Sequence, residues 1–142
     1  EAKFLRALYY YMLVTYYNGV PLILEEPVYA HGSLPRASRE EAVRAILDDL
    51  NDIIDRELLD WQWTKAADQG RATRGAAMAL KARLLLFEAS KLVNPSNDAA
   101  KWQAAADAAK AVDSNFNTHF ESSPSRWNIS NIWYILYYTL FS

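Results

Sequence analysis

The spacing of the apolar residues behind Ser38 is the feature of this sequence that most restricts its fold. They recur at steps of three and four, which places them along one face of a helix: Val43, Ile46, Leu47, Leu50, Ile53, Ile54 and Leu58. The residues from Ser38 to Glu41 have the pattern of a capping box, in which the serine hydroxyl accepts from the glutamate amide and the glutamate carboxylate reaches back. The sequence therefore predicts a helix over about 39–58 whose apolar face is covered by other elements.

Another helix is predicted for residues 1–17, where apolar residues again recur at helical spacing. One face carries Phe4, Leu5, Leu8, Tyr9, Met12, Leu13 and Tyr16. Because Tyr10, Tyr11 and Val14 make the other side apolar as well, this helix is expected to be buried on several sides, in part by neighbours outside this chain. Asn18-Gly19 predicts its end, since both residues tolerate the left-handed conformation that terminates helices.

Two further helices are predicted between residues 73 and 115. The first has Thr73 as its N-cap and extends to about Leu92, before Asn94-Pro95 stops it. Its packed face consists of Ala76, Ala79, Leu80, Arg83, Leu84 and Phe87. The second begins near Asn97 and is expected to end at 113–115. Its apolar stripe consists of Trp102, Ala105, Ala106, Ala109 and Val112. Trp102 is expected to lie in the core. The small residues allow close packing as an antiparallel hairpin, the unit of tetratricopeptide-like repeats.

The composition supports an all-α fold and excludes several classes of protein. Glycine (4) and proline (5) are scarce, which disfavours β-sandwiches and barrels. Because the chain has no cysteine, it contains no disulfide scaffold, thiolate zinc site, iron–sulfur cluster or cysteine nucleophile. A net charge of −2 gives no electrostatic footprint for nucleic acid, so no such partner is expected.

The character of the sequence changes after residue 114. We expect residues 1–114 to form a helical scaffold segment and residues 115–142 to form an atypical aromatic-rich tail, irregular or with a short strand. The uncharged apolar stretch 132–141 is far shorter than the about 20 residues that a membrane-spanning helix needs. No signal peptide is visible in the sequence.

The acidic residues of the 39–58 helix are the most obvious candidates for metal ligands. Asp48, Asp52 and Asp55 share one helical face, where a cation could bridge them. Arg44 lies four residues before Asp48, and Arg56 lies four residues after Asp52. Since these spacings allow local ion pairs, we favour a solvated charged face and expect no metal site.

No catalytic constellation emerges from the sequence. His31 and His119 fall in separate loop-like regions, and neither has a metal-ligand spacing. The nucleophile-elbow pattern and the glycine-rich phosphate loops are absent. We therefore predict no catalytic residue and no cofactor, and a hydrolase is the least favoured function.

The candidate ligand-binding residues are Trp61 and Trp63, which lie in a polar loop. Exposed indoles stack on the C–H faces of sugar rings while polar neighbours bind the hydroxyls. An extended loop presents both indoles on one side, because one residue separates them. The competing interpretation, which we favour, is that they pack over the helix ends. Arg71 and Arg74 flank Thr73, the N-cap of the helix that follows this loop. They could hold an anion, but we favour the interpretation that they shape the entry of the chain into that helix.

Five ordered motifs across residues 1–112 resemble those of the SusD/RagB family. They are EAKFLRALYYY (1–11), GVPL (19–22), PRAS (35–38) with ILDDL (46–50), GRATRGAA (70–77) with ALKARL (79–84), and WQAAA (102–106) with AAK (108–110). The motifs coincide with predicted caps, turns and helix stripes, so they read as architectural. No binding residue is carried over from them.

The resemblance implies a tetratricopeptide-like helical scaffold, present here as part of a larger outer-membrane lipoprotein of the cell surface. Members of the family capture an oligosaccharide or peptide ligand for a SusC-like TonB-dependent transporter, and they are binding proteins rather than enzymes. The lipid-bearing cysteine of the family is not in this chain. The alternative function is a tetratricopeptide-like protein–protein adaptor. The apolar ends of the chain also predict self-association.

Overall fold

The computed structural model of the chain describes residues 1–25 and 34–120. This part contains four α-helices, one 3-10 helix and no strand. The elements are α1 (Ala2–Tyr17), α2 (Arg39–Asp55), the 3-10 turn η1 (Ala66–Asp68), α3 (Arg74–Ala89) and α4 (Ala99–Phe120). The predicted all-α class is thereby confirmed, while the tail segment 121–142 and His31 lie outside the described residues.

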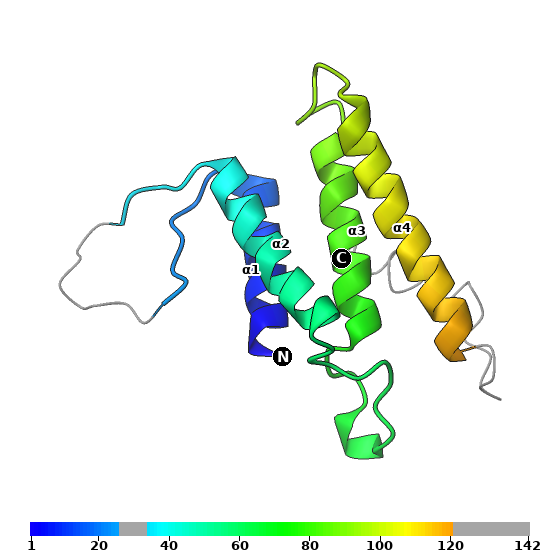
Figure 1. Cartoon of the computed structure of the whole chain (residues 1–142). Helices are drawn as coiled ribbons and strands as arrows, with labels where there is room; N and C mark the ends of the chain where they lie inside the picture. The colour runs from blue at the N-terminus through cyan, green and yellow to red at the C-terminus, as the bar shows by residue number, and fades with distance from the viewer. Residues whose placement is uncertain (26–33, 121–142) are drawn as a thin grey trace.

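The helices form two antiparallel hairpins, α1 with α2 and α3 with α4, as Figure 1 shows. The α1–α2 hairpin packs on the other through contacts of α2, and to a lesser extent α1, with α3. The largest fully buried side chains come from three of the helices: Val14, Ile46, Leu50, Ile53 and Leu84. Helix α2 supplies most of them, as its apolar stripe predicted. The predicted antiparallel hairpin of the two helices after residue 73, α3 and α4, is also confirmed.

Helix α2 begins at the predicted capping box. The Ser38 hydroxyl accepts from the Glu41 amide at 3.1 Å, and the Glu41 carboxylate accepts from the Ser38 amide at 2.8 Å. The hydrogen bond from the Ser38 backbone is the main cause that lowers the pKa of Glu41. The helix ends at Asp55, before the predicted end near Leu58, because Glu57 adopts a positive φ of 53° and redirects the chain.

Helix α1 is buried on one side in the described part of the chain, and the further burial that its sequence predicts was assigned in part to neighbours outside this chain. Its core face consists of Ala7, Tyr11 and Val14. The opposite face, here called the outer α1 face, consists of side chains 46% to 78% exposed: Leu5, Tyr9, Met12 and Tyr16. Helices α2 and α3 cover only the core side of α1, so the outer α1 face remains an uncharged apolar surface.

The end of α1 is held by the segment that leads into α2. Asn18 has a positive φ of 67°, and the Gly19 backbone lies so close to Ala37 that a Cβ on the glycine would sit 2.4 Å from the Ala37 carbonyl oxygen. Arg36 donates to the carbonyl of Tyr17 at 2.7 Å and to that of Gly19 at 2.9 Å. The guanidinium thereby satisfies carbonyl groups that a helix end leaves without partners.

Helix α3 starts as predicted, with the Thr73 hydroxyl accepting from the Ala76 amide at 3.2 Å. Helix α4 does not end at 113–115 as predicted but continues to Phe120. Two polar side chains in this stretch bond to carbonyls one turn earlier, Asn115 to Ala111 and Thr118 to Ser114, both at 2.9 Å. Because they do so within helical geometry, they do not terminate the helix.

The packed face of α4 is rotated from the predicted stripe. Ala105 is buried, but Trp102 is 41% exposed, so its assignment to the core was wrong. The Trp102 indole N–H donates to the Asn97 side chain at 2.9 Å, outside the core. An alanine-rich helix offers small residues on every side, so its sequence pattern leaves the contacting face ambiguous.

Candidate functional site

The two candidate tryptophans lie in the loop between α2 and α3, here called the tryptophan loop (59–73). Arg74 anchors this loop from the first turn of α3. Its amide donates to the Asp60 carbonyl at 3.0 Å, and its guanidinium donates to the Leu59 carbonyl at 3.1 Å. Arg74 also pairs with Glu57 at 2.8 Å. The favoured prediction that this arginine shapes the entry into the helix is therefore confirmed.

Trp61 is half-buried against two helices. The His119 ring stacks on it, with ring centroids 4.3 Å apart and planes inclined by 20°. The guanidinium carbon of Arg74 lies 5.2 Å from the Trp61 ring centroid. His119 belongs to α4 rather than to a loop, so the predicted placement of this histidine was wrong. These contacts agree with the packing interpretation for Trp61, since the stack joins the tryptophan loop to α4.

Trp63 is half-buried but faces a different set of side chains. Its indole N–H donates to the Ala72 carbonyl at 3.0 Å, which locks the ring against the loop. The Arg71 guanidinium carbon lies 5.0 Å from the ring centroid. Arg71 in turn donates to Glu1 at 2.8 Å and to Asp68 at 2.6 Å. We call this cluster of Trp63, Arg71, Asp68 and Glu1 the Trp63–Arg71 surface.

The charges of the Trp63–Arg71 surface stabilise one another. The hydrogen bond from Arg71 is the main cause that lowers the pKa of Glu1, and the bond to Glu1 raises the pKa of Arg71. The Arg71 side chain remains 47% exposed, so its remaining hydrogen-bonding capacity faces solvent. The pair of Arg71 with Asp68 could have been inferred from the sequence, because the two residues are three positions apart. The pair with Glu1 could not, because 70 positions separate Glu1 from Arg71.

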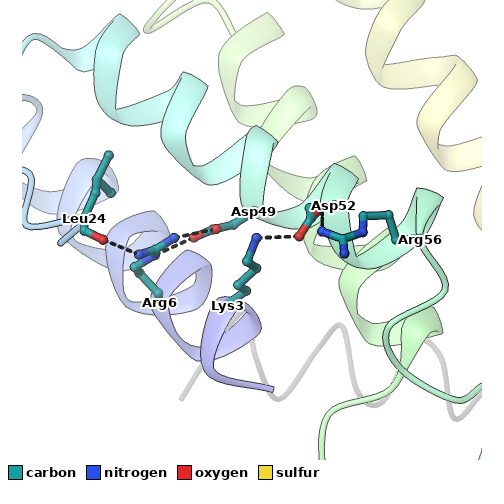
Figure 2. A network of polar contacts seen from close by, with 6 residues as sticks. All are labelled: Lys3, Arg6, Leu24, Asp49, Asp52 and Arg56. Atoms are coloured by element: carbon teal, nitrogen blue, oxygen red, sulfur yellow. Dashed lines mark hydrogen bonds and ion pairs between the residues drawn. The ribbon is translucent and has the colours of Figure 1, made fainter.

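The carboxylates of α2 hold the first hairpin together (Figure 2). Asp49 receives two hydrogen bonds of 2.7 Å from Arg6, which also donates to the Leu24 carbonyl at 2.9 Å. Asp52 pairs with Lys3 and, at 3.0 Å, with Arg56. The predicted Asp52–Arg56 pair is confirmed, while the Asp49–Arg6 pair was not predicted.

These ion pairs engage two of the α2 carboxylates, Asp49 and Asp52. The hydrogen bond from Lys3, followed by that from Arg56, lowers the pKa of Asp52, and the bond to Asp49 raises the pKa of Arg6. Within residues 1–25 and 34–120, no group of three or more histidine or acidic side chains is placed to hold a metal ion. Of the three carboxylates that the sequence places on one face, only Asp52 is paired with a basic residue of α1, while Asp48 and Asp55 have no ion pair among the described residues.

Comparison with known proteins identifies the relatives of this chain. Residues 1–86 match the model of a SusD-like family described as "Starch-binding associating with outer membrane". A SusD-like protein from Bacteroides fragilis is 30% identical, with a TM-score of 0.62 over 78% of this chain and 19% of that protein. Surface glycan-binding protein A from Bacteroides uniformis is 24% identical, with a TM-score of 0.60 over 89% of this chain and 25% of that protein. No curated protein sequence matches significantly.

The chain thus spans about a fifth to a quarter of these solved structures, 19% and 25% of their lengths. None of its described helices is long and apolar enough to cross a membrane. The family match covers the capping box of α2, the tryptophan loop and most of α3. The structural matches extend the likeness over the greater part of the chain. The chain belongs to the SusD-like family.

Proposed function

We propose that this chain is a scaffold segment of a SusD-like protein that captures a glycan at the outer membrane. The observation that carries the proposal is the family match over residues 1–86, whose description names starch binding and the outer membrane. The chain acts by binding, without turnover, and delivers its ligand together with a SusC-like TonB-dependent transporter at the cell surface. The printed name of the Bacteroides uniformis relative, a surface glycan-binding protein, is consistent with this role.

The glycan contact that we propose within this chain is the Trp63–Arg71 surface. An aromatic ring beside exposed planar charged groups is the composition that sugar-binding sites use, because the ring contacts C–H groups and the charges bind hydroxyls. Trp63 offers that combination with a 47% exposed Arg71 side chain, whose guanidinium lies over its ring. Trp61 is the weaker of the two candidates, since the His119 ring stacks on it in addition to the arginine that lies over each indole.

Calorimetric titration of the chain with maltooligosaccharides tests the glycan contact. Trp63→Ala is expected to abolish the binding heat. Trp102→Ala is the matched control, because Trp102 is also a partly exposed indole with a local N–H bond, to Asn97 at 2.9 Å. Retained binding in Trp63→Ala, equal loss in both variants, or no binding by the unmodified chain would each reject this surface as the glycan contact.

We further propose that the outer α1 face mediates self-association of this chain. In a two-fold symmetric contact the same patch is used by both copies, and the residues near the axis meet their own counterparts, so a patch that carries charges of one sign would oppose like charges. Leu5, Tyr9, Met12 and Tyr16 carry no charge, and the two basic residues of α1, Lys3 and Arg6, are paired with α2. The alternative is that a soluble peptide binds this face, which would make the chain a tetratricopeptide-like adaptor. In that case the chain is monomeric without the peptide and binds the peptide when it is added.

A further inference from the structure

The geometry points to Asn18 as a site of spontaneous deamidation at which the main chain converts to isoaspartate. Asn18-Gly19 is the single Asn-Gly pair in the sequence. In this reaction the Gly19 nitrogen attacks the Asn18 side-chain carbon Cγ. The reaction proceeds readily only where the backbone brings those atoms together and water can reach them.

The backbone of Asn18 is already arranged for ring closure. The five-membered succinimide ring contains Cα, Cβ and Cγ of the asparagine, its backbone carbonyl carbon and the next nitrogen, so Cβ and that nitrogen must lie on the same side of the Cα–C bond. The nitrogen and Cβ of an L residue are about 120° apart around this bond, so a ψ of −107° brings the Asn18 Cβ within about 15° of eclipsing the Gly19 nitrogen. Helical residues, with ψ of about −42°, are far from this arrangement.

The surroundings of Asn18 favour the attack. Gly19 has no side chain to obstruct its nitrogen, and in the described part of the chain its N–H has no acceptor. The Arg39 guanidinium donates to the Asn18 side-chain oxygen at 3.4 Å, the atom on which negative charge develops as Cγ becomes tetrahedral. Arg39 is itself held by Glu88 at 3.0 Å. Asn18 is exposed at an open hollow also lined by Tyr17, Arg36 and Glu40, so water reaches it.

The chemistry balances without any group beyond water. The Gly19 nitrogen forms a bond to the Asn18 Cγ, the Cγ–Nδ2 bond breaks, and the Gly19 proton leaves with the amide nitrogen as ammonia. Water then adds to one of the two ring carbonyls and the ring C–N bond breaks, which returns a proton to the Gly19 nitrogen. The product is aspartate or isoaspartate at position 18. Isoaspartate routes the main chain through Cβ and lengthens it by one carbon.

This lengthening falls at a closely packed and hydrogen-bonded point of the hairpin. Gly19 packs against the Ala37 carbonyl with no room for a Cβ. Arg36 donates a hydrogen bond to the Gly19 carbonyl, and the Ala37 amide donates one to the Val20 carbonyl at 3.1 Å. Isoaspartate at position 18 is therefore expected to loosen the connection between α1 and α2 and to lower the thermal stability of the chain.

Mass spectrometry of trypsin digests tests the proposal. The folded chain is incubated in mildly alkaline buffer beside a synthetic peptide of residues 7–36, in which Asn18 is the single asparagine. Deamidation adds about 1 Da to this peptide. The folded chain is expected to react about three- to tenfold faster than the free peptide, a barrier difference of about 1 kcal/mol. Slower reaction in the folded chain than in the peptide overturns the proposal, because the fold would then protect Asn18.

Two internal comparisons sharpen this test. Asn51 lies inside α2 and is the single asparagine of the tryptic peptide 45–56, so it reports the behaviour of a helical residue and is expected to stay intact. Arg39→Gln removes the charge that polarises the Asn18 amide. This variant is expected to deamidate at Asn18 about threefold more slowly than the unmodified folded chain. Peptide 7–36 ends before position 39, so the same peptide serves as the reference for both chains. An unchanged rate in a folded Arg39→Gln chain rejects the role given to Arg39.

Discussion

Arg6 on α1 and Asp49 on α2 form a two-point ion pair, with both nitrogen–oxygen distances 2.7 Å (Figure 2). The Asp49 side chain is only 7% exposed, while Arg6 is 34% exposed and also reaches the Leu24 carbonyl. One guanidinium therefore joins both helices of the first hairpin to the segment that follows α1. Since a nearly buried carboxylate needs its partner, this pair is central to the stability of the hairpin.

Arg6→Ala is expected to destabilise the chain by about 3 kcal/mol, because it leaves the Asp49 carboxylate buried without its cation. Urea denaturation followed by circular dichroism measures the change in the free energy of unfolding. Lys3→Ala is the control, since Lys3 is 45% exposed and its pair with Asp52 is expected to contribute much less to stability than the pair of Arg6 with Asp49. Equal losses in the two variants would contradict the importance assigned to the buried pair.

The pH dependence of stability is expected to include a contribution from Asp52. Lys3 and Arg56 lower the pKa of this carboxyl in the folded chain below its unfolded value of about 3.9. A lowered folded pKa stabilises the fold above the unfolded pKa, and this contribution is lost as the pH falls through the folded pKa. Asp52→Asn is therefore expected to flatten the decrease of the melting temperature below about pH 4.

The control for this acid titration is Asp48→Asn. Asp48 is exposed on the same helix and has no ion-pair partner among the described residues. Its variant is expected to keep the melting profile of the unmodified chain between neutral and acidic pH. A profile for Asp52→Asn that coincides with the one for Asp48→Asn would show that the ion pairs of Asp52 do not couple folding to pH.

Gly19 and Gly75 are expected to respond in opposite ways to replacement by alanine. A Cβ at Gly19 would lie 2.4 Å from the backbone oxygen of Ala37, so Gly19→Ala is expected to destabilise the chain by about 2 kcal/mol. A Cβ at Gly75 would meet the Trp61 ring at 3.7 Å, an ordinary contact. Because Gly75 lies within α3, Gly75→Ala is expected to stabilise the chain by up to about 1 kcal/mol. Thermal melts compare the two variants, and a stabilised Gly19→Ala chain would refute the close approach.

Self-association through the outer α1 face is expected to depend on Tyr9 and Met12, which are 61% and 48% exposed. Replacing both with glutamate places like charges opposite one another in a symmetric contact, so the double variant is expected to sediment as a monomer. Leu92→Glu is the control, because Leu92 is 82% exposed but lies beyond α3. Sedimentation velocity over a range of concentrations measures the association. A monomeric unmodified chain, or an association equally sensitive to Leu92→Glu, would argue against this face.

Local sequence was sufficient to predict the helices and their beginnings. The capping box at Ser38 and the N-cap at Thr73 involve residues three positions apart, so their contacts follow from the sequence without reference to the rest of the fold. The extent of α4 was harder to predict. Asn115 and Thr118 are polar residues typical of helix ends, but both bond to carbonyls one turn earlier and leave the helix intact.

The candidate site was predicted only in part. The tryptophan loop was evident from Trp61 and Trp63, but nothing in the sequence indicated that His119 would stack on one indole. Nor did it indicate that Glu1 would hold the arginine beside the other. Contacts between residues so far apart depend on how the two hairpins pack, and no local periodicity encodes that packing.

The all-α class, the helix caps and the membership of the SusD-like family could be predicted from the residues alone, because caps, periodicity and motifs depend on residues close together in the chain. Which helix faces are covered became clear from the packing of the two hairpins. The tertiary structure paired Arg6 with Asp49 across 43 positions, placed Trp102 outside the core and left the outer α1 face open. Burial depends on which elements pack together, and a helix such as α1, which is apolar on several sides, can pack through more than one face.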